Sequence, residues 1–378
     1  MLNEHNALML QRVHTFAQTE VNPEATQWST GALPNAALWQ RAAELNLYGM
    51  EVPTQLGGLG LGFVTKAKIG EILAGADFGF AMSVINTQNV ARNLTLGDNT
   101  RLQQLYLPRL LRGEISACTA LTEPDTGSDF AAIQTTATQA PDHWVLNGEK
   151  TWIINGRHAT LAIVFAQCAR AGDRDGIAAF LVNLDRAGCR RYAKDSAIQQ
   201  ASMGTGGFVL DNCRVPLDHC LVSPGQAFHA IMTEINGARA YVAAMCVGML
   251  DAALRCAQAY GQSRKTFGQP LHAHQAWRLT LARAATDLAA MRALVDQAAQ
   301  ALEQPGDAQL LCAQAKVFAV EACRQQLPRL LHAMGAHGLS PEYPMVRHSA
   351  AVSMAALTDG SDEMLLERIA LLTRPRSV

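Results

Sequence analysis

The sequence has no excess of charge of either sign: 31 Lys and Arg residues face 32 Asp and Glu residues, giving a formal net charge of −1. A protein that binds nucleic acid usually carries a clustered basic excess, so this balance argues against that class. Apolar residues make up 49% of the chain. No uninterrupted apolar run, however, reaches the roughly 18 residues of a membrane-spanning helix. We therefore predict neither a nucleic-acid partner nor a membrane span.

The nine cysteines contain no CxxC pair, and the first residues lack the basic stretch followed by an apolar stretch that marks a secretory signal. An odd number of scattered cysteines favours reduced thiols over a disulfide framework or a zinc site. We predict a cytoplasmic protein without a metal site. Its 378 residues are enough for two or three cooperating domains.

The residue pattern changes twice along the chain and predicts three domains. Residues 1–114 repeat apolar side chains at three- and four-residue spacing, which is typical of a helical domain. Residues 115–226 contain short β-rich runs, such as 144–146, separated by turn residues. Residues 227–378 are again helical and rich in Ala and Leu. Helices, then strands, then helices indicate an α+β fold with segregated layers.

The segment 120–129, ALTEPDTGSD, lies at the start of the β region and is rich in hydroxyl and glycine residues. Backbone N–H groups and the hydroxyls of such a loop are suited to an anionic or heteroaromatic ligand. A plain turn without a ligand explains the same composition. Both interpretations stay open on these residues alone.

Two further segments place an aromatic side chain beside polar groups. Residues 146–156, LNGEKTWIING, predict a β-hairpin by their Asn-Gly pairs, with Trp152 at its centre. Residues 264–271, RKTFGQPL, place Arg264 beside Phe267 at the end of a helix. Taken singly, such a Trp is more often part of a core, and such an Arg is more often solvated.

In this order, the three segments resemble the acyl-CoA dehydrogenase superfamily. TEPDTGSD is similar to the family's first signature, LNGEKTWIING to its second, and RKTFGQPL to its flavin-contacting helix end. The resemblance continues through GMEVP with GGLGLG, LYLP with GE, and RVP, and covers roughly residues 40 to 372 in co-linear order. It implies an N-terminal helical domain, a middle β domain and a C-terminal four-helix bundle. It also implies FAD as cofactor and a homo-oligomer, either a tetramer or a dimer.

The resemblance also implies FAD contacts for particular residues. Leu121 and Thr122 would meet the isoalloxazine edge, Ser128 the pyrophosphate, and Trp152 the face of the ring. Residues expected to reach the FAD of a neighbouring subunit are Arg264, Phe267, His274 and Gln275. The other expected cofactor contacts are Gly127, Ile154, His332, Gly335 and Ser361, and the expected substrate contacts are Ser128 and Arg239.

Two departures from the family pattern concern the flavin. Ile154 stands where the family has a Thr whose hydroxyl donates to flavin N5, and an Ile side chain cannot hydrogen-bond. A backbone donor compensates, or flavin reactivity is altered; both hypotheses stay open. His332 replaces the Gln that meets the adenine side of FAD, and Ala336 replaces the second Gly of the same motif.

A third departure concerns the substrate. The stretch 203–209, MGTGGFV, is several residues shorter than the family's usual loop near the acyl-CoA cleft. A more open entrance fits a thioester on the phosphopantetheine arm of an acyl or peptidyl carrier protein at least as well as free CoA. It also fits a small substrate that is not a thioester.

The fourth departure concerns the catalytic base. The family's Glu in Tyr-Glu-Gly-Thr aligns with Asp359, which lies between Thr358 and Gly360. Some relatives carry the base on an earlier helix, just ahead of an Arg, but that position is Ala238 beside Arg239. We predict Asp359 as the base. In the alternative, Asp359 is a structural helix cap and Glu363 is the base.

These residues predict an FAD-dependent dehydrogenase that oxidises an acyl thioester, either acyl-CoA or acyl-carrier protein. A carboxylate takes the α-proton while the flavin accepts the β-hydride. The expected electron acceptor is an electron-transfer flavoprotein or O₂. One rival is an oxidase or monooxygenase of the same superfamily, similar to nitroalkane oxidase. The other is a flavin-binding scaffold without catalysis.

Overall fold

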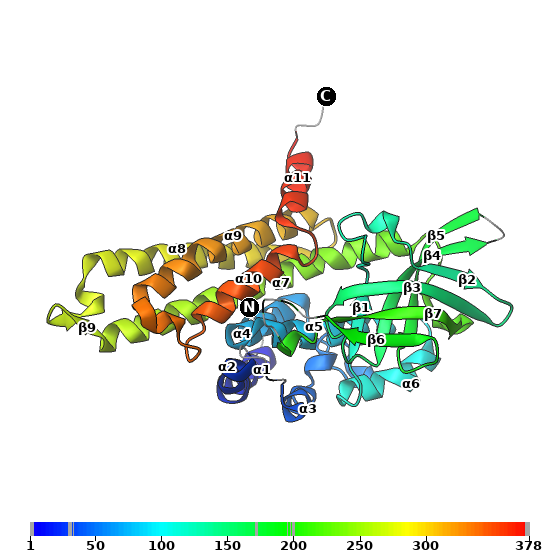
Figure 1. Cartoon of the computed structure of the whole chain (residues 1–378), viewed down its shortest axis with the longest axis horizontal. Coiled ribbons are helices and arrows are strands. Elements are labelled where there is room, and N and C mark those ends of the chain that lie inside the picture. Colours follow the sequence, from blue (N-terminus) through cyan, green and yellow to red (C-terminus); the bar gives the residue numbers. More distant parts are fainter. Residues whose placement is uncertain are drawn as a thin grey trace. The chain divides into compact units, whose positions relative to one another are not determined.

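The computed structural model describes residues 4–28, 32, 34–170, 173–194, 196, 198 and 201–374 (Figure 1). The chain forms two compact units, each built from stretches that are separated in sequence. The helical unit comprises Met1–Ala32, Gly62–Ala81 and Ile235–Val378, and the sheet unit comprises Leu33–Leu61 and Met82–Glu234. The division into three consecutive domains at residues 114 and 226 stays a prediction.

Helices dominate both ends of the chain, as the apolar spacing predicts. The α-helices are α1 (Glu4–Phe16), α2 (Asn22–Trp28), α3 (Ala36–Glu44), α4 (Phe63–Ala76), α5 (Phe78–Leu96), α6 (Thr100–Leu111), α7 (Ala227–Ser263), α8 (Gln275–Leu302), α9 (Gln309–Met334), α10 (Met345–Leu357) and α11 (Asp362–Leu372). One π-helical turn, η1 (Ala17–Val21), joins α1 to α2. The 3₁₀ turns are η2 (Leu47–Gly49), η3 (Thr54–Leu56), η4 (Phe130–Ala132), η5 (Ala201–Met203), η6 (Leu217–His219), η7 (Leu271–Ala273) and η8 (Gly335–Leu339).

The described strands of the sheet unit form one eight-stranded sheet with the path β6-β7-β3-β2-β4-β5-β8, and β1 pairs with β4 outside this path. The strands are β1 (Ala117–Ala120), β2 (Thr136–Gln139), β3 (His143–Ile153), β4 (Leu161–Arg170), β5 (Asp173–Asn183), β6 (Cys189–Ala193), β7 (Gly206–Pro216) and β8 (Cys220–Val222). Both β1 and β2 run parallel to β4, whereas the other neighbours are antiparallel. Two short strands, β9 (Lys265–Thr266) and β10 (Gln269–Pro270), pair separately.

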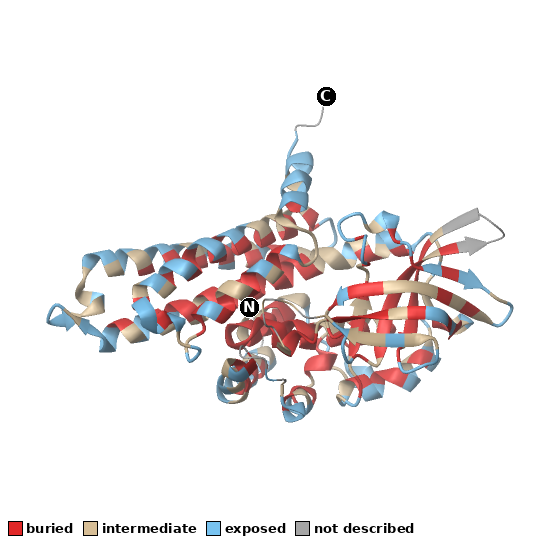
Figure 2. Cartoon of the chain, viewed as in Figure 1, coloured by how far each residue is buried: buried red, intermediate tan, exposed pale blue. Residues whose placement is uncertain are grey.

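Alternating side chains of the strands form the core of the sheet unit. Phe180, Phe208 and Leu146 are fully enclosed, and Trp144 packs edge-on against Phe180 at a ring distance of 5.1 Å. Figure 2 shows the buried residues concentrated along the central strands of this sheet. The β-rich runs identified in the sequence therefore form the centre of the sheet.

The predicted hairpin over 146–156 is wrong, because β3 passes through Asn147 and Gly148 without turning. The pair instead forms an irregularity in the register between β3 and β7. Gly148 has a φ of +150°, and an added Cβ would lie 2.5 Å from the hydroxyl oxygen of Thr135. Asn147 accepts a hydrogen bond from the backbone N–H of Asn212 at 2.7 Å. The Asn-Gly signal therefore marks a bulge in a long strand rather than its end.

In the helical unit, early and late stretches of the chain pack together. Helices α4 and α7 touch backbone to backbone at Gly248, where an added Cβ would lie 1.9 Å from the carbonyl oxygen of Glu71. Glu303, just after α8, accepts a hydrogen bond from the backbone N–H of Val64 at 2.8 Å. The buried His348 of α10 lies 3.2 Å from the carbonyl oxygen of Gly75. Segments from the two ends of the sequence thus share one core.

One described helix, α7, is long and apolar enough to cross a membrane by length and composition. Within its most apolar stretch, 78% of the residues are buried inside the structure. Polar residues interrupt this stretch, so the sequence shows no uninterrupted apolar run of membrane-spanning length there. Its burial is that of a core helix.

Candidate functional site

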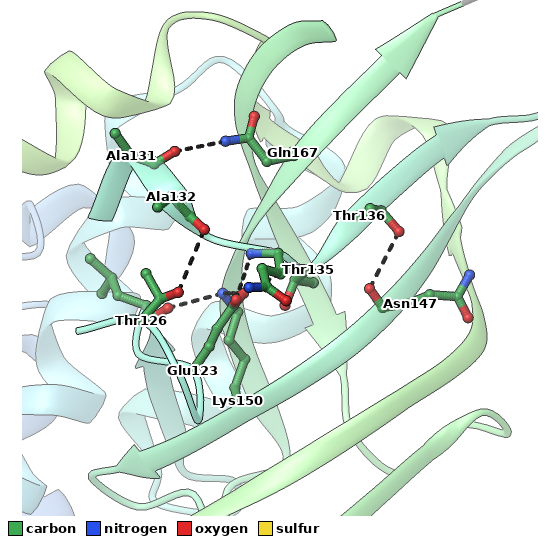
Figure 3. Close-up of polar contacts among 11 residues, drawn as sticks. Glu123, Thr126, Ala131, Ala132, Thr135, Thr136, Asn147, Lys150 and Gln167 are labelled. Atoms are coloured by element: carbon green, nitrogen blue, oxygen red, sulfur yellow. Dashed lines mark hydrogen bonds and ion pairs between the residues drawn. The ribbon is translucent and has the colours of Figure 1, made fainter. Parts of the chain in front are cut away.

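A buried ion pair anchors the loop that follows β1. Lys150 on β3 lies 2.8 Å from a carboxylate oxygen of Glu123, and the two side chains are 0% and 4% exposed (Figure 3). The same ammonium donates to the carbonyl oxygen of Leu121 at 3.0 Å. The Glu123 carboxylate also accepts hydrogen bonds from the backbone N–H groups of Gln134 and Thr135, at 2.5 and 2.9 Å. Both charges of the pair are therefore compensated.

Burial and the ion pair shift the pKa values of Lys150 and Glu123 in opposite directions. Burial lowers the pKa of Lys150 to about 8, although the Glu123 carboxylate opposes the shift. Burial raises the pKa of Glu123, but the Lys150 charge and the hydrogen bonds outweigh it, so its pKa is lowered. The pair is therefore charged near neutral pH and fixes the position of loop 121–129 against the sheet.

Thr122 and Trp152 are brought close together by the backbone. The N–H of Thr151 donates to the carbonyl oxygen of Thr122 at 3.0 Å. Trp152 is therefore the neighbour of a residue that is hydrogen-bonded to the loop. Trp152 has a φ of +58° and is 51% exposed. The ammonium of Lys194 lies 5.0 Å from the centre of its ring. A bulky side chain at positive φ is strained, and such strain concentrates at binding sites.

Asn155 holds the turn that follows Trp152. Its side-chain amide donates to the carbonyl oxygens of Ser83 and Ala117, both at 3.0 Å, and to the Thr87 hydroxyl at 3.2 Å. The Ser83 hydroxyl donates to its side-chain oxygen. Asn155 itself has a φ of +63°, which Asn tolerates better than most residues. This fully buried network fixes the turn that contains Ile154, which is partly buried.

The loop and the turn present a donor set that fits FAD. Gly127 and Ser128 are exposed, and an added Cβ at Gly127 would meet nothing within 4 Å. Hydroxyl and backbone N–H donors on an open loop suit a diphosphate, and an exposed indole beside them suits a flat heteroaromatic ring. Leu121 and Thr122 are partly buried between these two parts.

In the helical unit, Asp359 lies in a turn between α10 and α11 with a φ of +58°. Its carboxylate oxygen Oδ2 is enclosed and has no hydrogen-bond partner among the described residues. Burial raises the pKa of Asp359, and the charges of Lys316 and Arg239 oppose that rise. An enclosed carboxylate with an unused oxygen is suited to accept a proton.

Asp359 does not cap a helix. Helix α11 begins after Ser361, whose hydroxyl accepts a hydrogen bond from the backbone N–H of Met364 at 3.5 Å. Glu363 is exposed, and hydrogen bonds from its own backbone and from Ser361 lower its pKa. The capping role belongs to Ser361, and the geometry favours Asp359 over Glu363 as a base. An FAD contact of Ser361 stays a prediction.

Arg239 lies against the backbone of the same turn. Arg239 is 7% exposed, and its guanidinium donates through Nε to the carbonyl oxygen of Asp359 at 3.1 Å. Its Nη1 donates to the side-chain oxygen of Asn236 at 3.0 Å. The structure therefore places Arg239 next to the predicted base, and its predicted contact with substrate stays a prediction.

The segment after α7 forms a tight hairpin of β9 and β10. Phe267 at its tip has a φ of +48° and is 94% exposed. Arg264 is also exposed, and its carbonyl oxygen accepts a hydrogen bond from the N–H of Leu271 at 2.9 Å. His274 Nε2 lies 3.2 Å from the carbonyl oxygen of Thr266 and donates to it. Gln275 begins α8 and is exposed.

His332 lies on α9 in a groove of about 570 Å³ between α8 and α9. The groove is lined by Ala276, Trp277, Thr280, Arg283, Pro328, Arg329, His332 and Ala333. The indole N–H of Trp277 donates to the carbonyl oxygen of Ala333 at 3.3 Å. Gly335, with a φ of +62°, directly follows α9 as its C-cap and is exposed. His332 thus lies beside two arginines, while its predicted adenine contact stays a prediction.

Sequence reasoning missed four residues: Glu123, Lys150 and Asn155, which hold the loop and the turn of the sheet unit, and Lys316, which contacts the Asp359 turn of the helical unit. All four side chains are polar or charged and buried, and the sequence around them does not indicate that burial. Lys150 is a charged residue within a strand pattern, and such a charge is a weak signal for a buried ion pair. Its partner, Glu123, lies 27 residues earlier, and their contact follows only from the pairing of the strands.

The chain belongs to the acyl-CoA dehydrogenase family. Three family models match it in order: Acyl-CoA dehydrogenase, N-terminal domain, over residues 3–114; the middle domain over 118–213; and the C-terminal domain over 225–371. Members of this family are FAD-dependent oxidoreductases with the α+β arrangement seen here. The resemblance and the fold class predicted from the sequence are confirmed.

Similar proteins cover nearly the whole chain. The mitochondrial short-chain specific acyl-CoA dehydrogenase of Homo sapiens is 33% identical over 365 residues, which are 96% of this chain and 88% of the relative. The solved butyryl-CoA dehydrogenase of Megasphaera elsdenii is 27% identical, with a TM-score of 0.93 and 99% of each chain covered. A glutaryl-CoA dehydrogenase of Mycobacterium smegmatis, solved with FADH2, is 27% identical, with a TM-score of 0.92 and coverages of 100% and 96%.

Proposed function

We propose that this protein is an FAD-dependent dehydrogenase that oxidises an acyl thioester between its α- and β-carbons. The observation that carries the proposal is the enclosed Asp359 carboxylate at the position of the family's base, with one oxygen unused. Its electron acceptor is proposed to be an electron-transfer flavoprotein or O₂.

The residues of the chain divide the reaction between them. Asp359 accepts the α-proton on its free oxygen, in a turn that Arg239 holds through the Asp359 carbonyl. Loop 121–129 and Trp152 bind and orient the cofactor, because Lys150 and Asn155 hold both segments against the sheet. FAD, when bound, supplies the acceptor for the hydride equivalent from the β-carbon.

The direct test is anaerobic mixing of the purified holoenzyme with butyryl-CoA. The 450 nm absorbance of oxidised flavin should bleach in a single turnover. Butyryl-CoA is chosen because two similar proteins are named for short-chain or butyryl substrates. Persistence of the absorbance with butyryl-CoA, butyryl-carrier protein and longer thioesters would exclude thioester oxidation and leave the two rivals, an oxidase or monooxygenase of another substrate and a flavin-binding scaffold.

We propose that the active protein is a homo-oligomer in which Arg264 reaches the FAD of a neighbouring subunit. The exposure of Arg264 and of Phe267 at a hairpin tip supports this arrangement. Arg264→Ala should weaken FAD binding by about tenfold to a hundredfold, the usual effect of losing a hydrogen bond to a charged group. The ratio of flavin to protein absorbance after dilution and gel filtration measures the loss.

The matched control is Arg255→Ala. Arg255 is also an exposed arginine near the end of α7, but it pairs with Asp251 one turn earlier. This variant should keep its flavin. If Arg264→Ala retains flavin as well as Arg255→Ala does after dilution, Arg264 does not bind FAD.

We further propose that the acyl group arrives on a carrier protein. Only Gly204 and Thr205 separate η5 from β7, and the carbonyl oxygen of Gly204 is bonded to the N–H of Arg157 at 3.1 Å. Such a short, pinned connection offers little surface to the nucleotide of CoA. The kcat/KM for butyryl-carrier protein should therefore exceed that for butyryl-CoA by about tenfold, the equivalent of one or two polar contacts.

Butyryl-pantetheine lacks both the nucleotide and the carrier protein. It therefore shows whether contacts with the CoA nucleotide or contacts with the carrier protein determine the preferred thioester. It should react about as well as butyryl-CoA if the enzyme makes few contacts with the nucleotide. A higher kcat/KM for butyryl-CoA than for both other thioesters would exclude the carrier-protein proposal and leave the dehydrogenase assignment intact.

A further inference from the structure

A buried lysine contacts both sides of the turn that carries Asp359. Lys316 lies on α9 and is 0% exposed. Its ammonium donates to the carbonyl oxygens of Thr358 and Gly360, the residues on either side of Asp359. Arg239 donates to the carbonyl oxygen between them. Three successive carbonyl groups are thus held by two buried cations.

The turn needs such restraint because its backbone is strained. Asp359 has a φ of +58° and Gly360 a φ of +102°, and a non-Gly residue at positive φ is strained. Buried cations are costly unless each finds acceptors, so the ammonium and the turn stabilise each other. A lysine placed only for packing would not need its charge here.

We propose that Lys316 is a positioning residue for the dehydrogenation: its ammonium fixes the 358–360 turn and favours the carboxylate form of Asp359, ready to take a proton. This inference rests on the proposed function, since it assigns Lys316 to the base of that reaction. In this proposal Lys316 acts through Asp359 and does not contact the reacting atoms.

The electrostatics agree with the geometry. Burial lowers the pKa of Lys316 to about 8, and the charge of Asp359 opposes this shift more than that of Asp362 or the Cys246 thiol. Below about pH 8 the ammonium is charged and stabilises the carboxylate. Without that charge, the pKa of Asp359 rises further, so a higher pH is needed to ionise the base. Other groups facing the cluster are the Cys312 thiol and Arg368, both near Arg239.

The experiment compares the pH dependence of flavin reduction by butyryl-CoA in the holoenzyme, measured by stopped flow from pH 5.5 to 9. Lys316→Gln keeps a hydrogen-bond donor but removes the charge, and Lys316→Met removes both. In both variants the midpoint of the acid limb should rise by about one pH unit or more. Lys316→Arg, which keeps the charge, should restore much of the parent midpoint. If Lys316→Met does not fold, Lys316→Gln alone decides.

Lys66→Met is the matched control. Lys66 is another buried lysine of the helical unit, 4% exposed, with its ammonium 5.3 Å from the ring centres of Phe63 and Tyr241. Its loss should leave the midpoint unchanged.

Two outcomes overturn the inference in different ways. If Lys316→Gln has the parent midpoint while Asp359→Asn is slow, Lys316 is merely structural and the proposed function stands. If Asp359→Asn reduces its flavin at the parent rate, the base assignment fails, and the role of Lys316 fails with it.

Discussion

Asp359→Asn should slow flavin reduction by at least about a hundredfold, which is typical for loss of a general base. The amide has nearly the shape of the carboxylate, so the turn held by Lys316 and Arg239 should persist and FAD should stay bound. Stopped-flow mixing with butyryl-CoA gives the rate, and the absorbance spectrum gives the flavin content. Normal flavin content with a slow rate is the expected combination.

Glu363→Gln is the control, because Glu363 is the alternative base that the sequence suggested and is exposed. It should react at the parent rate; a slow Glu363→Gln beside a normal Asp359→Asn would make Glu363 the base. Asp359→Glu extends the reach of the carboxylate by roughly 1.5 Å, the length of one C–C bond. It should keep measurable activity and shift the preferred acyl chain.

Lys150→Met should destabilise the protein by about 3–5 kcal/mol, because it leaves the Glu123 carboxylate buried without its counter-charge. A loss of that size lowers the melting temperature by about 10 °C in a unit of this length. Loop 121–129 should also lose its anchor, since the ammonium donates to the Leu121 carbonyl. Thermal unfolding of the flavin-free protein measures the first effect, and FAD affinity measures the second.

The double variant Glu123→Gln with Lys150→Met separates charge from packing. Removing both charges should recover part of the stability lost in Lys150→Met, because no uncompensated charge stays buried. FAD affinity should not recover, since the Leu121 carbonyl still lacks its donor. A double variant no more stable than Lys150→Met would show that the buried Glu123 charge does not cause the loss.

Local patterns predicted most of the fold. Apolar spacing predicted the helices at both ends of the chain, and β-rich runs predicted the central strands. The Asn147-Gly148 pair misled the prediction, because the same two residues suit a hairpin turn and a bulge within a strand. Which of the two forms depends on Thr135 and Asn212, whose contacts follow only from strand pairing.

The candidate functional residues of each unit were predictable where they lie within one short segment. The loop 121–129 and Asp359 stand in short motifs that resemble those of the family, so sequence alone indicated them. Lys316 lies more than forty residues before the turn that it holds, in a helix whose other buried residues are mostly apolar. Nothing in its own segment distinguishes it from an exposed lysine, because its partners are backbone carbonyls.

The interleaving of the helical unit has a consequence for synthesis. On the ribosome, α2 and α4 emerge early, whereas Arg347 and His348, which form hydrogen bonds with them, emerge near the end. Much of the sheet unit lies in the contiguous stretch Met82–Glu234 and can fold in between. The first helices must then wait for these late contacts for more than half of translation, and an incompletely packed unit is open to aggregation and to chaperones. A chain stalled before α10 therefore keeps its early helices without their final partners.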